Sequence, residues 1–226
     1  MNEVLLTGIQ TPLKGIRRTA ARRMVQAWQA PVFHLGIEVE MEAALAKGKS
    51  APGVTVTDVL LSLAANTLAS SPEINAHYSD EVITTYSEIN IGIAVATEAG
   101  LMVPVIHNVQ DLSLVEIGAR RKEIVAKARN GELRMADIDG ATFTISNLGM
   151  LGIDRFDAII NPPQVAILAV GSTRKIPVVR ESGISIGQIS AFTLTCDHRA
   201  IDGAMGAKFL SRLKALLEEE TESASQ

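Results

Sequence analysis

Near its C-terminus the chain places a histidine and a carboxylate four residues apart. Residues 193–204 read TLTCDHRAIDGA, so an apolar, β-branched run ends abruptly in charge and an amphipathic helix follows. This order predicts that His198 and Asp202 lie where a buried strand meets the start of a helix. A base and the carboxylate that orients it are often held at such a junction. The pattern fits a second interpretation equally well: a turn in which Asp202 caps the helix and His198 is a core histidine with its hydrogen bonds satisfied.

Sequence motifs for other chemistries are missing. The chain has no G-x-G-x-x-G, no Walker loop, no C-x-x-C, no H-E-x-x-H and no G-x-S-x-G. With four histidines and one cysteine, a metal site would need several carboxylates, and no spacing suggests one, so no metal is predicted. Cys196 precedes His198 by two residues, which allows a Cys–His nucleophile. A small thiol in an apolar strand is more often part of the core, and we leave Cys196 out of the predicted site.

Composition limits the class of protein. The 226 residues are 47% hydrophobic and 20% charged, which is enough for a domain with a large core. The net charge of −4 gives no indication of a nucleic-acid partner, and no apolar run approaches the roughly 18 residues of a membrane span. The single cysteine fits a reducing compartment, so we expect a cytoplasmic protein. The arginines of residues 17–23 are interpreted as the solvated face of a helix.

Hydrophobic periodicity predicts the elements that must position these residues. We expect a helix from residue 16 that stops before Pro31, a half-buried strand over residues 32–40, and an apolar helix over 58–70 capped by Thr57. Later helices are expected over 111–128 and from Gly203. Strands are expected over 83–86, 89–97, 101–107, 141–146 and 165–171. A hairpin of 177–180 and 185–192 follows, and residues 188–195 supply the strand before His198. The elements mix without strict alternation, which predicts a two-layer α/β (α+β) domain, a mixed β-sheet packed with helices, over residues 16–217. Residues 1–15 form an extended lead-in and residues 218–226 a frayed acidic tail.

Residues 197–204, DHRAIDGA, resemble the signature of the dihydrolipoamide acyltransferases, the core of the 2-oxo-acid dehydrogenase complexes. These enzymes are similar in fold to chloramphenicol acetyltransferase. Further segments resemble the same family in the same order, from about residue 10 to residue 217: residues 16–24, 91–106, 143–150 and 160–168. Residues 146–150 and 170–171 look more like the pyruvate or acetoin branch than the succinyl branch, which favours an acetyl group.

The resemblance implies an acyl transfer between the dihydrolipoyl thiol and coenzyme A, by direct attack of a thiol on a thioester. His198 would be the base: a free thiol has a pKa near 8.5 and an unperturbed histidine one near 6.5, which is close enough for assistance at neutral pH. Ser146 would donate to the oxyanion, although a hydroxyl that caps the turn before Asn147 is the alternative. Asp202 would pair with an arginine and orient His198. Arg17 is the candidate, or else a solvated helix charge.

The resemblance also implies partners. Asn147, Gly171 and Thr173 stand near the coenzyme A contacts of the family. The active site of the family lies at a trimer interface, with His198 and Ser146 from different subunits. A lipoyl domain would deliver the acyl group, and the decarboxylase and the dihydrolipoamide dehydrogenase would complete the complex. The compartment would be the cytoplasm, or the mitochondrial matrix in a eukaryote.

Two departures from the family pattern narrow the prediction. No lipoyl or subunit-binding domain precedes the matched region, so the chain is either an excised catalytic domain or a stand-alone acyltransferase. Residues 218–222, EEETE, replace an apolar segment that joins trimers into larger cores, so we expect assembly to stop at the trimer.

Two alternative functions remain. One is acetylation of a small hydroxylated acceptor, as in chloramphenicol acetyltransferase, although one tryptophan and two tyrosines give little material for an aromatic pocket. The other is a non-catalytic scaffold or coenzyme A-binding core. The presence of His198, Asp202 and Ser146 together argues against the scaffold.

Overall fold

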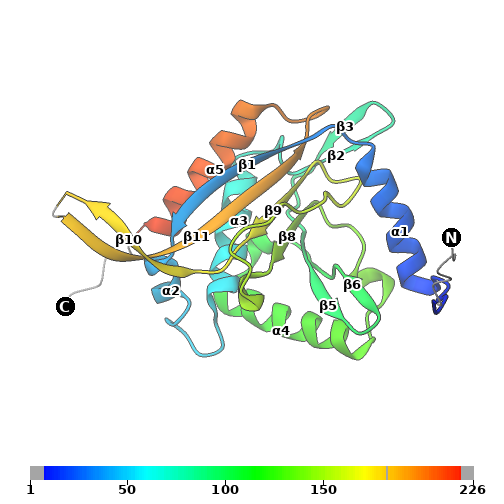
Figure 1. Cartoon of the computed structure of the whole chain (residues 1–226), viewed down its shortest axis with the longest axis horizontal. Helices are drawn as coiled ribbons and strands as arrows, with labels where there is room; N and C mark the ends of the chain where they lie inside the picture. Colours follow the sequence, from blue (N-terminus) through cyan, green and yellow to red (C-terminus); the bar gives the residue numbers. More distant parts are fainter. Residues whose placement is uncertain (1–7, 182, 220–226) are drawn as a thin grey trace, which may run out of the picture.

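The sheet is built around the 15-residue strand β11 (Gly183–Asp197). The computed structural model describes residues 8–181 and 183–219. In it β11 pairs antiparallel with β1 (Val32–Glu40) along one side, and with β9 (Ala166–Val170) and β10 (Arg174–Arg180) along the other (Figure 1). Beyond β9 the sheet continues through β8 (Phe143–Asn147), β4 (Ile91–Ile93) and β7 (Val105–Ile106).

The sheet is mixed, as predicted. β8 runs parallel to β9 and to β4, whereas the other pairs within the sheet are antiparallel. Two short ribbons stand outside it, β2 (Ala76–Ser79) with β3 (Val82–Thr85) and β5 (Val95–Thr97) with β6 (Gly100–Met102). The mixture of parallel and antiparallel strands confirms the predicted fold class.

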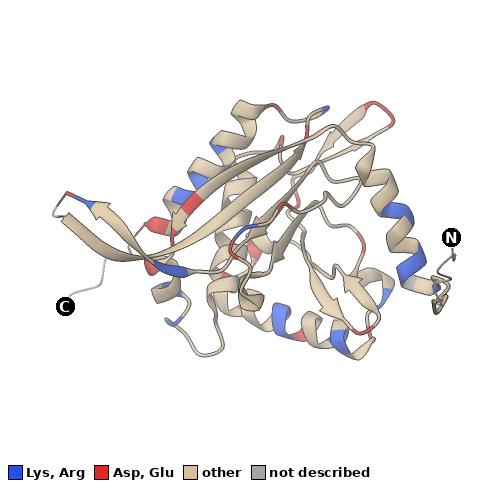
Figure 2. Cartoon of the chain, in the orientation of Figure 1, with Lys and Arg blue, Asp and Glu red and all other residues tan. Residues whose placement is uncertain are grey.

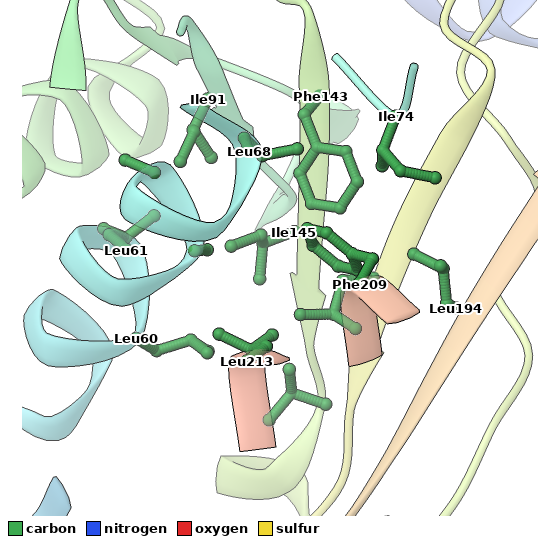
Figure 3. Close-up of a cluster of buried hydrophobic side chains, with 14 of the residues drawn as sticks. Leu60, Leu61, Leu68, Ile74, Ile91, Phe143, Ile145, Leu194, Phe209 and Leu213 are labelled. Carbon is green, nitrogen blue, oxygen red and sulfur yellow. The ribbon is translucent and has the colours of Figure 1, made fainter. Parts of the chain in front are cut away.

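Helices cover one face of the sheet. The apolar helix α3 (Val56–Ala69) lies between the sheet, α4 (Leu114–Asn130) and α5 (Gly203–Glu218), so other elements cover most of its sides (Figure 1). The short α2 (Glu42–Lys47) closes one end of this layer. Figure 3 shows the core where α3, α5 and β8 meet, and its labelled side chains are all buried: Leu60, Leu61, Leu68, Ile74, Ile91, Phe143, Ile145, Leu194, Phe209 and Leu213.

Strand β1 is half-buried, as its alternating sequence predicts. Phe33, Leu35 and Ile37 pack against the core under α5, whereas the residues between them face away from it and are exposed. Helix α1 (Gly15–Trp28) stands apart at the edge of the molecule, and of its side chains whose burial the structure describes only Ala27 is buried. Its charged side chains Arg17, Arg18, Arg22 and Arg23 are exposed, which agrees with the predicted solvated face (Figure 2).

Several predicted boundaries are wrong. Thr55, not Thr57, caps α3, because Asp58 accepts from the Thr55 backbone N–H at 2.8 Å and completes a capping box. The single strand expected over 101–107 is two strands, β6 and β7, separated by Pro104, which has no N–H to donate. Similarly, the strand expected over 89–97 divides at residue 94 into β4 and β5, and β2 was not predicted.

Three short 3-10 helices complete the described secondary structure: Val109–Asp111, Met135–Asp137 and Gly149–Leu151. Helix α4 begins at residue 114, later than predicted, because a capping box of Ser113 and Glu116 closes its first turn. The acidic tail falls mostly outside the described residues, although α5 extends to Glu218. No helix in residues 8–181 and 183–219 has the length and apolar character needed to cross a membrane.

Candidate active site

His198 directly follows the end of β11, in the tight turn that leads into α5. Its backbone N–H donates to the carbonyl oxygen of Pro31 at 2.9 Å, which ties the turn to the start of β1. The imidazole is exposed and lies against the ring of Phe33, with 4.6 Å between ring centroids. His198 is therefore an accessible histidine at a strand end, and the interpretation of it as a buried core histidine is wrong.

The other three histidines make hydrogen bonds within the fold. Nδ1 of His34 lies 2.9 Å from the hydroxyl of Thr195, and Nε2 of His107 lies 3.1 Å from a backbone carbonyl oxygen. His77 bridges the hydroxyl of Tyr86 and another backbone carbonyl oxygen. Within residues 8–181 and 183–219, no three His, Cys, Asp or Glu side chains gather as metal ligands.

Asp197 and Arg199, on either side of His198, form an ion pair that the sequence analysis did not single out. Asp197 is 1% exposed, and its carboxylate accepts from the guanidinium of Arg199. This bond raises the pKa of Arg199 above its usual value. The available signal was the acidic residue at the end of an apolar strand, because a buried carboxylate needs a partner.

Asp202 caps helix α5. Its Oδ1 accepts from the backbone N–H of Met205 at 2.8 Å, and the side chain is exposed. The capping interpretation of Asp202 is thus confirmed, and it does not exclude an effect on the neighbouring turn.

Arg17 does not meet Asp202 within one chain. It lies in the first turn of α1, where its side chain adjoins Gly100 at the tip of the β5–β6 ribbon. The turn of His198 is tied instead to Pro31, beyond the other end of α1, and a helix rises about 1.5 Å per residue. A distance of about 16 Å thus separates Arg17 from the end of α1 near that turn. The pairing predicted for Arg17 and Asp202 is not formed in the single chain.

Ser146 lies near the end of β8, half-buried, and Asn147 follows it as the last residue of the strand. The turn after β8 is capped by Asn147, whose Oδ1 accepts from the backbone N–H of Gly149 at 2.9 Å. Asn147, rather than Ser146, therefore takes the turn-capping role that was the alternative for the serine.

Strand register separates Ser146 from His198. Ser146 pairs with Ala169, and Ala169 pairs with Thr193 of β11, so Ser146 lies level with Thr193. His198 is about five residues further along, which amounts to about 17 Å at about 3.3 Å per residue. A single thioester cannot contact both side chains at hydrogen-bond distance within one chain.

A cleft of about 370 Å³ brings together three of the predicted coenzyme A contacts, Asn147, Gly171 and Thr173. Gly171 allows the segments around it to approach, because a Cβ there would overlap the carbonyl oxygen of Asp154. A Cβ on Gly149 would in turn lie 2.6 Å from the carbonyl oxygen of Gly171. These two glycines let the loop after β8 touch the loop after β9, and that contact forms one wall of the cleft.

Half-buried Arg121 and buried Asp58 form a second ion pair, beside the cleft. Nε of Arg121 lies 2.5 Å from Oδ1 of Asp58, and Asp58 is fully buried. The pair joins α4 to the first turn of α3, and Arg121 lines the cleft.

Cys196 belongs to the core, as predicted. It is fully buried, and burial raises the pKa of its thiol to about 12. A thiol with that pKa is protonated at neutral pH and is a poor nucleophile.

Residues 7–224 match the profile of the 2-oxoacid dehydrogenases acyltransferase family, catalytic domain. The chain belongs to this acyltransferase family. Among curated proteins it is 38% identical to the dihydrolipoyllysine-residue acetyltransferase component of the pyruvate dehydrogenase complex of Rickettsia bellii, over 92% of this chain and 52% of that protein. The chain spans about half the length of the curated relatives it matches.

Solved members of the family share the fold. The dihydrolipoamide acetyltransferase of Azotobacter vinelandii is 31% identical, with a TM-score of 0.90 over 94% of this chain and 92% of that chain. The cubic core of a pyruvate dehydrogenase multienzyme complex is also 31% identical, with a TM-score of 0.87 and the same coverage. Chloramphenicol acetyltransferase is similar in fold alone, at 16% identity and a TM-score of 0.60 over 87% of this chain and 94% of its own.

Three residues named for one of these relatives have the same sequence spacing as three candidate site residues of this chain. The study of the Azotobacter enzyme concerns the roles of a serine, a histidine and an asparagine in its catalytic mechanism. Ser146, His198 and Asp202 of this family member stand at the same intervals from one another, with aspartate in the place of the asparagine.

Proposed function

We propose that this chain is the catalytic domain of a dihydrolipoamide acyltransferase, which moves an acetyl group between the dihydrolipoyl thiol and coenzyme A. The observation that carries the proposal is an accessible His198 at the end of β11, at the same spacing from a serine as the histidine of the Azotobacter relative. The acyl group is taken from the relatives, which are acetyltransferase components of pyruvate dehydrogenase complexes.

In this mechanism His198 takes the proton of the incoming thiol. The resulting thiolate attacks the carbonyl carbon of the partner's thioester, and the negative charge moves to the carbonyl oxygen. The Ser146 hydroxyl donates to that oxygen, and loss of one such donor typically lowers the rate by about 10²–10³. Collapse of the adduct expels the second thiolate, which recovers the proton from His198. No acyl-enzyme forms.

Each site needs two copies of the chain, because register holds Ser146 and His198 about 17 Å apart within one copy. A head-to-tail ring meets this requirement, since the surface around His198 of one copy faces the surface around Ser146 of the next. We propose the homotrimer as that ring.

Coenzyme A is proposed to occupy the cleft beside Ser146, with contacts to Asn147, Gly171 and Thr173. These three residues share that cleft with the strand end that carries Ser146. The lipoyl group would arrive on a separate domain or chain, and the decarboxylase and the dihydrolipoamide dehydrogenase would be the other partners. Nucleic acid and membrane are not among the proposed partners. The compartment would be the cytoplasm of a bacterium or the mitochondrial matrix.

Asp202 is proposed to fix the path of the chain after His198 by capping α5. An orienting role of Arg17 toward Asp202 requires that the two side chains come from different copies, since they are far apart within one.

The deciding experiment measures acetyl transfer from acetyl-CoA to free dihydrolipoamide. Wild type is compared with His198→Ala and Ser146→Ala, and His107→Ala serves as a control that removes an exposed histidine elsewhere. We expect the two site variants to lose at least about 10²-fold in kcat and the control to match wild type. A wild type no faster than His198→Ala would refute the proposal and favour a non-catalytic scaffold. Transfer to small alcohols but not to dihydrolipoamide would favour chemistry like that of chloramphenicol acetyltransferase.

A further inference from the structure

Asp197 and Arg199 are the sequence neighbours of His198, and the ion pair between them fixes the turn that carries His198. Nε of Arg199 lies 2.9 Å from Oδ1 of Asp197, and Nη2 lies 2.6 Å from Oδ2. The backbone N–H of Arg199 also donates to the same carboxylate at 3.0 Å. One buried side chain therefore holds both the backbone and the side chain of the residue two positions later.

The backbone of Asp197 is anchored as well. The backbone N–H of Asp197 donates to the carbonyl oxygen of Val165 at 2.8 Å, and the carbonyl oxygen of Asp197 accepts from Ala200 and Ile201. These bonds wind residues 197–201 into a single tight turn. His198 and Arg199 are the exposed residues of this turn, and the imidazole of His198 is accessible.

Tyr78 packs against Arg199, the other residue of the ion pair. The guanidinium of Arg199 lies over the ring of Tyr78, 4.1 Å from its centroid. Tyr78 belongs to β2, outside the main sheet, and its backbone N–H donates to the carbonyl oxygen of Pro163 at 2.8 Å. Arginine suits this place because its planar group can bind a carboxylate with two nitrogens and stack on an aromatic ring at the same time.

We propose that Arg199 is a positioning residue for His198, acting through its two-nitrogen bond to Asp197 and its stacking on Tyr78. The proposal rests on the proposed role of His198 as the base. Proton transfer requires the base within hydrogen-bond reach of the thiol, so a small displacement of the turn lowers the rate sharply. Arg199 needs no contact with substrate to have this effect.

Lysine at position 199 tests the role, because it keeps the charge but loses the planar fork and the stacking. We expect Arg199→Lys to lower kcat by about tenfold or more while KM for acetyl-CoA and for dihydrolipoamide stays within about twofold. Arg212→Lys, at an exposed arginine of α5, is the matched control and should leave both constants unchanged. An unchanged kcat in Arg199→Lys would overturn the proposal.

A double-mutant cycle separates positioning from a general loss of structure. In the His198→Ala background there is no imidazole to position, so Arg199→Lys should change the residual rate less than about twofold. The same fold-loss in both backgrounds would show that Arg199 acts independently of His198 and would overturn the proposal. If His198→Ala itself equals wild type, the proposed function fails instead, which is a different outcome.

Tyr78 provides a second route if Arg199→Lys does not fold cooperatively. Tyr78→Phe keeps the ring under the guanidinium, and should recover most of the kcat that Tyr78→Leu loses. Thermal unfolding of both variants is measured alongside. Equal losses of kcat in the two Tyr78 variants, or a loss in Tyr78→Leu that persists in the His198→Ala background, would contradict positioning through this stack.

Discussion

Ser146 and His198 each lie at the C-terminal end of a strand, but the two strands run in opposite directions, so the residues are about 17 Å apart along the strand direction. The cause is the register of three strands, since β11 runs antiparallel to β9 and β9 runs parallel to β8. No rotamer change can close such a gap, because side chains reach only a few ångströms. In the proposed reaction each chain contributes two half-sites, and the first prediction follows from this arrangement.

Two inactive variants should complement one another in mixed assemblies. When His198→Ala and Ser146→Ala are co-expressed with different tags and purified through both, a site is intact if its histidine comes from the serine variant and its serine from the histidine variant. A trimer that carries both tags holds two copies of one variant and one of the other, so one of its three sites is intact and about a third of the sites should be active. The measurement is kcat per chain relative to wild type. Doubly tagged assemblies no more active than either variant alone would contradict a shared site.

Asp202 should stabilise the folded protein by capping α5. Asp202→Ala removes the acceptor for the Met205 backbone N–H and should lower the free energy of unfolding by about 1 kcal/mol, whereas Asp202→Asn keeps an acceptor oxygen and should stay close to wild type. Chemical denaturation at a fixed protein concentration measures both.

Acetyl-transfer rates then distinguish the cap from a charge role. If capping is what orients the turn of His198, Asp202→Asn retains most of the activity and Asp202→Ala does not. Equal loss in the two variants would show that the negative charge itself is required, as a pairing with arginine would demand.

The ion pair of Asp58 and Arg121 beside the cleft should stabilise the folded protein. Arg121→Met leaves the fully buried carboxylate of Asp58 without its partner, and such a loss typically destabilises a protein by about 3–5 kcal/mol. The double variant Asp58→Asn with Arg121→Met removes both charges and should recover much of that loss. Urea denaturation of the three proteins measures the effect. A single variant as stable as wild type would show that the pair is not needed.

Local pattern was sufficient to predict much of the fold. The alternation of β1 indicated which of its faces is buried, and the mixture of elements indicated a mixed sheet. The break at Pro104 and the cap at Thr55 were both readable in the sequence and were missed, because an apolar run and a nearer threonine gave stronger local signals.

The site was only partly predictable, for a different reason. His198 and Ser146 follow from short motifs, but the distance between them depends on the pairing of β8, β9 and β11, which no local pattern encodes. The stacking of Arg199 on Tyr78 likewise joins segments more than a hundred residues apart in the chain.

The last prediction concerns the Cys196 thiol and the free energy of unfolding at alkaline pH. Burial raises the pKa of its thiol from 9.0 to about 12, so between these values the folded state retains a proton that the unfolded state loses. Stability rises with pH where the unfolded state binds more protons, so here it must fall as pH rises from about 9 toward 12. Below pH 9 both states hold the proton, so this thiol no longer makes the stability depend on pH.

Cys196→Ala lacks this group, and its free energy of unfolding should therefore fall less steeply than that of wild type above pH 9. Denaturation curves at several pH values for the two proteins measure the difference, with Cys196→Ala corrected for its lower stability at pH 7. In the same window a thiol reagent should label wild type slowly when folded and rapidly in denaturant, because attack requires an accessible thiolate. Parallel stability curves, together with rapid labelling of the folded protein in that window, would show that the thiol is not held in the core.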